Sequence, residues 1–199
     1  MFSKKVCLII LLGLPFISFS QQPIDSVQIT KILSEVNVNA LRAGEKTPVA
    51  FTNISKTEIE KGNLGQDLPY IISLTPSVVT TPDAGAGIGY TGFRIRGSDP
   101  TRINVTVNGI PLNDSESQGV WWVNMPDFTS SVENIQIQRG VGTSTNGASA
   151  FGASVNLQTD GVSKKPYFLT NNTFGSYATL KNNIEFGTGL LDNKVTFDG

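Results

Sequence analysis

The chain has 199 residues, 39% of them hydrophobic and 16% charged, with a formal net charge of −1. It has no histidine and a single cysteine, Cys7, which excludes histidine-based triads, cysteine–histidine dyads and zinc clusters. The near-neutral charge without a basic stripe argues against nucleic acid as a partner, and the twenty glycines are typical of a β protein rich in turns.

Residues 1–20 read MFSKKVCLIILLGLPFISFS, with two lysines ahead of an apolar run and small residues at the end. This layout predicts a secretory signal peptide. A membrane anchor helix is the alternative, but Gly13 and Pro15 interrupt the run, which is shorter than the roughly 18 to 20 residues of a span. We therefore expect an exported protein.

Residues 21–48 form a polar leader with two short alternating runs, DSVQIT and LSEVNVNA. In the second run, Val36, Val38 and Ala40 would share one face of an extended strand. The pattern alone favours a solvated leader or the first strand of a domain. The alternative is a strand that adds to the edge of a partner's sheet, where its backbone groups would be satisfied.

Regular turn punctuation from residue 49 to residue 160 indicates one small domain, which two short helices open. The stretch SKTEIEKG predicts a helix with Ser55 as its N-cap, Glu58 completing a capping box and Gly62 as its stop. The stretch QDLPYIISLT predicts a second helix. Its inward-facing residues are expected to be Leu68, Ile71 and Ile72.

Alternating runs bounded by Gly, Pro, Asn or Asp predict the strands of this domain. They are SVVT, GFRIRG, RINVTVNG, VENIQIQRG and SVNLQT. In the third run, apolar side chains alternate with polar ones from Ile103 to Asn108, so we expect a half-buried sheet. The domain is therefore predicted to be α+β.

Two short motifs within the domain could carry chemistry. The stretch GIGYTG from Gly87 to Gly92 matches a dinucleotide-binding pattern, but it runs into a strand instead of a helix, so we interpret it as a glycine-rich surface loop. The carboxylates Asp114 and Glu116 could bind a cation or act as an acid–base pair. Nothing in the sequence fixes their geometry, and solvated turn residues are the favoured interpretation.

Residues 161–199 alternate polar and apolar residues in longer runs around short turns. Such runs are typical of transmembrane β-strands, which need roughly 9 to 11 residues; a soluble β extension is the alternative. The aromatics that would suit an interfacial girdle are Tyr167, Phe168, Phe174 and Tyr177. Because a few membrane strands would leave open edges in lipid, we expect the chain to be the N-terminal fragment of a longer protein.

Four motifs, taken in order, resemble those of the TonB-dependent outer-membrane receptors of Gram-negative bacteria. They are GFRIRG at residues 92–97, VNGIPLND at 107–114, VENIQIQRG at 132–140 and NGASAFGASVNLQT at 146–159. Two positions depart from the family pattern: Asn108 stands where Asp is usual, and Val141 stands where proline is common. With LSEVNVNA ahead of them, the motifs look most like those of receptors from the Bacteroidetes.

The resemblance implies an α+β plug domain, a small mixed β-sheet with short helices, followed by the first antiparallel strands of a transmembrane β-barrel. It implies an outer-membrane transporter instead of an enzyme, with no cofactor and no metal. The plug would lie within the barrel, and the leader would be periplasmic. The implied partners are TonB of the inner membrane, a small-molecule ligand such as a ferric siderophore, and outer-membrane lipid through the barrel.

The resemblance also assigns three groups of residues. The TonB-interacting strand would be Glu35, Val36, Asn37 and Val38, with DSVQIT as a fallback. Ligand contacts from two apical loops, residues 83–90 and 115–122, would be Tyr90, Gln118, Trp121 and Trp122. A sheet face that pairs with carboxylates of the plug or the barrel wall would carry Arg94, Arg96 and Arg139.

Two alternatives of other classes stay open on the residues alone. A secreted β-rich module could bind carbohydrate through Trp121 and Trp122. A carboxylate-dependent hydrolase would need Asp114, Glu116 or Asp127 to titrate abnormally.

Overall fold

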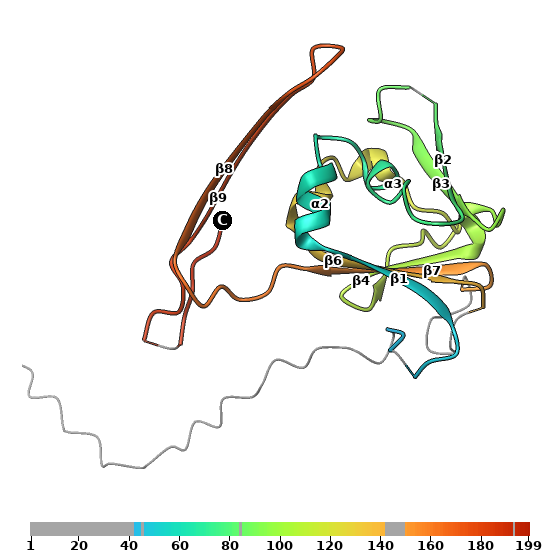
Figure 1. Cartoon of the computed structure of the whole chain (residues 1–199), viewed down its shortest axis with the longest axis horizontal. Helices are drawn as coiled ribbons and strands as arrows, with labels where there is room; N and C mark the ends of the chain where they lie inside the picture. The colour runs from blue at the N-terminus through green and yellow to red at the C-terminus, as the bar shows by residue number, and fades with distance from the viewer. Residues whose placement is uncertain (1–41, 45, 84, 142–149, 193) are drawn as a thin grey trace, which may run out of the picture. The chain divides into compact units, whose positions relative to one another are not determined.

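The computed structural model describes residues 42–199 except 45, 84, 142–149 and 193 (Figure 1). The predicted signal peptide and the predicted TonB-interacting strand, Glu35 to Val38, lie outside the described residues. Among the described residues, no helix is long and apolar enough to cross a membrane.

A five-stranded mixed sheet is the framework of the domain. Its strands are β1 (Ala50–Ser55), β4 (Ile103–Val107), β5 (Ile110–Pro111), β6 (Val132–Arg139) and β7 (Ala153–Thr159). They lie in the order β1-β6-β7-β4-β5, and only β4 and β7 pair in parallel (Figure 1). The Asn108-Gly109 turn, with φ of 50° and 84°, joins β4 to β5 and uses the two residue types that best tolerate positive φ.

Two further pairs of strands form separate two-stranded sheets. The strands β2 (Val78–Pro82) and β3 (Thr91–Ile95) pair antiparallel, as do β8 (Tyr167–Phe174) and β9 (Leu180–Gly187). The predicted arginine-bearing strand, β3, therefore belongs to a different sheet from β6, which ends at Arg139. The expectation that Arg94, Arg96 and Arg139 share one sheet face is wrong.

Both predicted helices are present. In α2 (Lys56–Gly62), the Glu58 carboxylate accepts hydrogen bonds from the Ser55 N–H at 2.8 Å and the Ser55 hydroxyl at 2.7 Å. The second helix, α3 (Leu68–Ile71), is a single turn and shorter than predicted. The described residues also form the 3-10 turns η2 (Pro100–Arg102), η3 (Trp122–Asn124) and η4 (Phe128–Ser131).

The hydrophobic core fills the side of the sheet on which α2 and α3 lie (Figure 1). Alternate residues of β4, β6 and β7 supply its floor, for example Val105, Ile137 and Val155, which are aligned across the three strands. The residues that cover this floor from the helices and from β3 are Ile59, Leu68, Ile72, Phe93 and Ile95. The period-two pattern of the sequence thus becomes one continuous apolar layer.

The opposite face of the sheet is polar, yet it is also buried. Its side chains, none more than 4% exposed, are Asn104, Thr106, Gln136, Gln138, Ser154 and Asn156. The prediction of a half-buried sheet is therefore wrong for β4. Two reasons are visible: β4 is an interior strand, and the segment around Ala43 is hydrogen-bonded onto this face through Gln136.

Candidate functional site

A cavity of about 400 Å³ lies between the β2–β3 hairpin and the loop that follows β5. Its lining comes from Thr81 and Asp83, from residues 89–94, from residues 99–101, from Val105, and from Ser117 and residues 119–123, so both predicted ligand loops contribute to it. Tyr90, Trp121 and Trp122 are among the lining residues. Three of the four predicted ligand-binding residues are thus brought together at one site, although 31 residues separate Tyr90 from Trp121 in the sequence.

The two adjacent tryptophans have different environments. Trp121 is 52% exposed, whereas Trp122 is 3% exposed and belongs to the core. The Trp122 ring lies 5.9 Å from the ring of Phe93, at an interplanar angle of 40°. Trp122 is therefore a core residue that packs beneath the surface of the cavity. Trp121 and Tyr90, which is 62% exposed, present aromatic surface to solvent.

The loop after β5 is fixed by a compact turn around Asp114. Its carboxylate accepts hydrogen bonds from the Ser117 N–H at 2.7 Å, the Ser117 hydroxyl at 2.9 Å and the Glu116 N–H at 3.1 Å. These bonds, those from Ser117 first, lower the pKa of Asp114, since they favour its charged form. Its hydrogen bonds make Asp114 a residue that stabilises the turn. Among the described residues, no three His, Cys, Asp or Glu side chains are grouped to hold a metal ion.

Gln118 lies in the same turn but is not among the residues that line the cavity. It adopts a positive φ of 58°, and its side-chain amide donates to the Ser115 carbonyl at 2.8 Å. In this conformation the side chain stabilises the loop that presents Trp121.

Asn113 and Asp67 anchor the two loops, and the sequence did not single out either one. The Asn113 side chain accepts from the Val105 N–H at 2.8 Å and donates to the Ile103 carbonyl at 2.9 Å, which ties its loop to β4. The Asp67 carboxylate, at the start of α3, accepts from the Gly89 N–H at 3.0 Å and the Thr91 hydroxyl at 2.8 Å. The glycine-rich loop is thus held by a carboxylate of its own domain.

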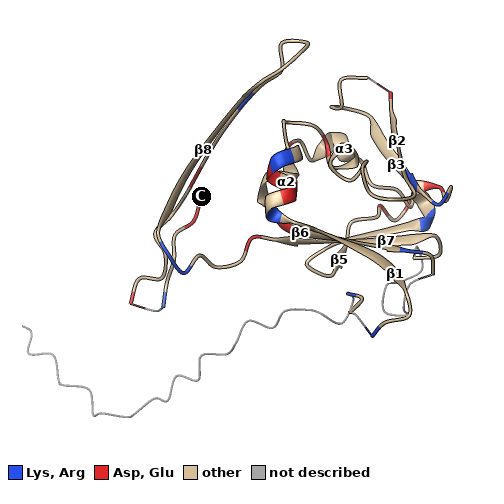
Figure 2. Cartoon of the chain, in the orientation of Figure 1, with Lys and Arg blue, Asp and Glu red and all other residues tan. Residues whose placement is uncertain are grey.

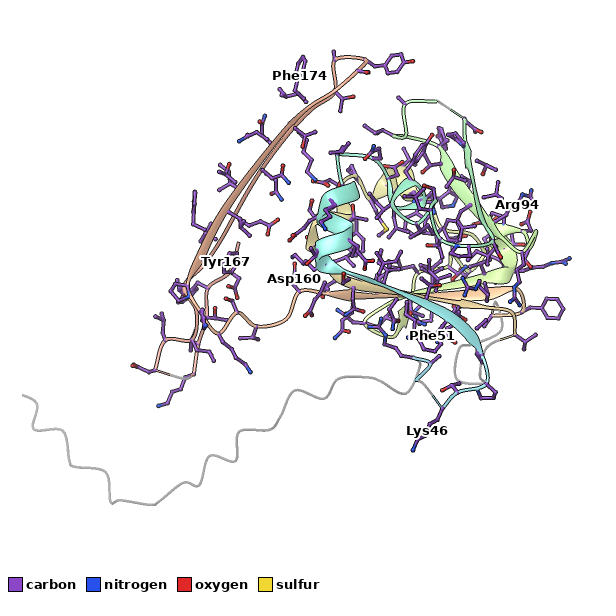
Figure 3. The ribbon with its side chains drawn as sticks, viewed as in Figure 1. Lys46, Phe51, Arg94, Asp160, Tyr167 and Phe174 are labelled. Atoms are coloured by element: carbon purple, nitrogen blue, oxygen red, sulfur yellow. The ribbon has the colours of Figure 1, made fainter. Side chains whose placement is uncertain are left out.

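The three predicted arginines all make contacts within the domain. Arg94 points away from the domain body and lies 3.4 Å from Asp99, with both side chains more than 40% exposed (Figure 3). Arg96 has a positive φ of 51°, beyond the end of β3, and donates to the Arg139 carbonyl at 3.2 Å. The Arg139 guanidinium donates to the Thr52 hydroxyl at 2.9 Å. Figure 2 shows charged residues of both signs near the end of β3 and on α2.

The profile of the family described as TonB-dependent Receptor Plug Domain matches residues 43–154. The chain belongs to this family. The match spans β1 to β6, both loops of the cavity and the start of β7, so the domain is a plug domain.

Relatives and solved structures agree with this assignment. The chain is 25% identical over 163 residues to a probable TonB-dependent siderophore receptor, PirA, of Acinetobacter baumannii, a match that covers 77% of this chain and 21% of that protein. The fold is similar to that of FpvA of P. aeruginosa, with a TM-score of 0.59 at 14% identity over 72% of this chain and 18% of FpvA. It is also similar to the alcaligin receptor FauA of Bordetella pertussis, with a TM-score of 0.57 at 19% identity over 73% of this chain and 24% of FauA. The chain spans about a fifth of the length of the curated relative.

The plug domain is joined to the β8–β9 hairpin by an ion pair that the sequence did not reveal. The Lys181 ammonium, on β9, lies 2.6 Å from the Asp127 carboxylate and donates to the Ser130 hydroxyl at 2.8 Å. The Lys181 side chain is only 8% exposed, and the Asn63 amide completes the cluster by donating to Ser130 at 3.0 Å. Asp127, one of the carboxylates considered for a hydrolase, is thus engaged in a structural contact.

The two faces of the hairpin differ in chemistry. Strand register places Phe168 opposite Phe186 and Phe174 opposite Leu180, and these four side chains are at least 50% exposed. Lys181, Asn183 and Glu185 alternate with them on the other face. Tyr167 and Phe174 lie at the two ends of β8 (Figure 3). The first face, called the apolar face below, also carries Ile184 and three polar residues, Thr170, Asn172 and Asn182, so it is mainly but not wholly apolar. A mainly apolar face of this period is typical of lipid-facing strands.

Proposed function

We propose that this chain carries the plug of an outer-membrane receptor that takes up a ligand with energy supplied through TonB. The observation that supports this proposal is the match of residues 43–154 to the plug family, together with the fold. The plug gates the passage, and the protein is a transporter instead of an enzyme. The residue assignments follow the plug architecture: the leader is periplasmic, residues 49–160 form the plug, and residues 161–199 begin the barrel, with the apolar hairpin face toward lipid.

The ligand class we propose is a ferric siderophore, because the relative PirA and the solved structure of PiuA, both of Acinetobacter baumannii, are named as siderophore receptors. The cavity between the two loops is the proposed contact site. Exposed aromatic rings at Tyr90 and Trp121 offer flat surface for stacking against such a ligand, and polar loop groups surround them. Gln118 contributes indirectly, by shaping the loop, and Trp122 supports the floor.

The ligand proposal is tested by binding of a panel of ferric siderophores to cells that express the receptor. We expect Trp121→Ala combined with Tyr90→Ala to weaken binding of the cognate ligand about tenfold or more, since each lost aromatic contact removes on the order of 1 kcal/mol. Leu74→Ala is the matched control, because Leu74 is 96% exposed and does not line the cavity. Unchanged binding in the double variant would exclude this cavity as the ligand site.

The energy-coupling strand is proposed to be Glu35 to Val38, with residues 25–30 as the fallback. Replacing Val36 and Val38 by proline removes two N–H donors of an added strand, so uptake should stop while ligand binding persists. Replacing the same residues by alanine keeps the donors and serves as the control. Normal uptake in the proline variant would exclude this segment.

The plug–barrel contacts are proposed to include the three arginines. Arg94 is well placed for such a contact, because its side chain is 48% exposed and its ionic partner Asp99 is exposed as well. Replacing Arg94 by methionine should leave the plug folded and weaken its binding to the inner wall of the barrel. Trypsin sensitivity of the plug in outer-membrane vesicles would report that loosening, and unchanged sensitivity would remove Arg94 from the contact set.

A further inference from the structure

The backbone of Ala43 is held by a single buried side chain, that of Gln136 in β6. The Ala43 N–H donates to Gln136 Oε1 at 2.7 Å, and Gln136 Nε2 donates back to the Ala43 carbonyl at 3.0 Å. A primary amide can form this two-way contact because it carries the same donor and acceptor as a peptide group. Gln136 therefore pairs with Ala43 as a residue of a neighbouring strand would.

Other side chains hold the Gln136 amide in place through further hydrogen bonds. Gln136 Nε2 also donates to Asn53 Oδ1 at 2.8 Å, and Gln136 Oε1 also accepts from Gln138 Nε2 at 3.0 Å. The two donors and two acceptor sites of the amide are all occupied, so its orientation is fixed. Gln136 is 2% exposed and Ala43 is 8% exposed, which keeps water from replacing these bonds.

A second anchor lies next to this contact. The Arg42 guanidinium donates to Gln158 Oε1 at 2.7 Å, and the same oxygen accepts from the Asn134 side chain at 3.0 Å. A turn follows directly, in which the Thr47 N–H donates to the Gly44 carbonyl at 2.9 Å. The chain is thus fastened to the polar face of the sheet immediately before it enters β1.

The position of this attachment gives it a mechanical meaning. A force applied to the chain before Arg42 acts first on the contacts of Arg42 and Ala43, and acts on β1 only after those contacts have broken. Strand β1 is the edge strand and pairs with β6 alone, so it can leave while β6, β7, β4 and β5 stay paired. The pull would act on its Ala50 end, where the ladder opens one pair at a time.

We propose that the Gln136–Ala43 contact is a release clamp, which holds the leader against the plug and must open before β1 can be drawn away. Gln136 bonds to the backbone of Ala43 and not to its side chain. The contact itself therefore does not depend on which side chain stands at position 43. The inference rests on the proposed function in one respect, namely that a periplasmic partner draws on the leader. The anchoring itself does not depend on that partner.

The anchoring is tested by site-resolved amide hydrogen exchange in the purified receptor in detergent. We expect Gln136→Leu, which keeps the size and removes every bond, to accelerate exchange of the Ala43 amide about tenfold or more, while Ile135 and Ile137 keep their protection. Gln136→Leu also removes the hydrogen bonds of Gln136 to Asn53 and Gln138, so its effect is not confined to Ala43. Ala43→Pro is therefore the second variant.

Ala43→Pro removes the donor from the leader side and leaves the sheet untouched; its readout is faster exchange of the Gly44 amide. Ser154→Ala is the matched control, because Ser154 lies on the same buried face and its hydroxyl has no hydrogen-bond partner among the residues that the structure describes. Unchanged exchange of the Ala43 amide in Gln136→Leu, together with unchanged exchange of the Gly44 amide in Ala43→Pro, would overturn the anchoring.

The release role is tested with the purified periplasmic domain of TonB and the same receptor variants. We expect both clamp variants to bind TonB severalfold more tightly than the wild type when no ligand is present, because their leader is already free. Faster exchange with unchanged TonB binding would overturn the release role. A wild-type receptor that binds no TonB under any condition would refute the proposed function instead, while the exchange data would still decide the anchoring.

Discussion

Trp121 and Trp122 are adjacent in sequence, and we predict that replacing each by alanine has opposite consequences. Trp122 is 3% exposed and packs against Phe93, whereas Trp121 is 52% exposed. Trp122→Ala should therefore destabilise the plug and leave the ligand surface in place. Trp121→Ala should weaken ligand binding and leave the plug as stable as before.

The magnitude follows from burial. Truncating a fully buried tryptophan to alanine costs about 3–5 kcal/mol, which combines lost transfer free energy with the cavity left behind. A domain of this size has a total stability of about 5–15 kcal/mol, so Trp122→Ala removes a large share of it. Trp121→Ala, at a half-exposed position, should change the free energy of unfolding by no more than about 0.5 kcal/mol.

The assay is native-state hydrogen exchange of the slowest amides in β4 and β7, which reports the free energy of opening the plug within the receptor. Trp122→Phe is the control, because phenylalanine keeps an aromatic contact with Phe93 and should recover more than half of the loss. Equal stability of the two alanine variants would refute the assignment of Trp122 to the core and Trp121 to the surface.

Three further predictions concern single contacts. Lys181→Met should change plug stability by less than about 1 kcal/mol, whereas Asp127→Asn, which leaves a buried ammonium without its counter-charge, should cost about 2–3 kcal/mol by the same exchange measurement. The Asp114 turn, whose carboxylate pKa is lowered in the fold, should be intact above the ordinary aspartate pKa of about 3.9 and loosen as pH falls through the lowered folded value; an NMR pH titration of Ser117 reports it. Asn108→Asp should be nearly neutral, and Asn108→Val should cost about 2–3 kcal/mol because a β-branched residue is strained at a φ of 50° and loses the side-chain bonds to Thr159.

Each of these has an outcome that would contradict it. Equal losses for Lys181→Met and Asp127→Asn would mean that Lys181 is hydrated instead of buried. A Ser117 amide signal that moves near neutral pH would place another group in the Asp114 turn. A stable Asn108→Val variant would show that the β4–β5 turn can adopt a different geometry.

The local pattern of the sequence predicted the elements well. The capping box at Ser55 and Glu58 formed as expected, because both partners are three residues apart and need no distant contact. The alternating runs became β2, β3, β4, β6 and β7, because period-two alternation is a local signal of a strand, although each strand needs a partner to form. Strand β1 was not among the predicted strands, since its sequence AFTNIS alternates weakly and it pairs with β6 over 80 residues away.

Properties that depend on distant partners were not predictable. Alternation in β4 assigns polar and apolar side chains to opposite faces of the sheet. It cannot show that the polar face is buried as well as the apolar one. The spacing of Arg94 and Arg96 indicates one face, yet the left-handed conformation of Arg96 ends the strand at Ile95. Likewise, Lys181 occupies an ordinary polar position of its strand, and only the fold shows that Asp127 meets it.

The position of β7 has a consequence for biogenesis. It is the last strand of the plug in the sequence, yet it lies in the middle of the sheet, between β6 and β4. While the chain is synthesised from its amino end, β4 and β6 have no strand between them, and the apolar layer that they share with β7 is incomplete. The sheet can close only after Thr159 has been added, so the apolar residues of β4 and β6 are exposed to aggregation during that interval.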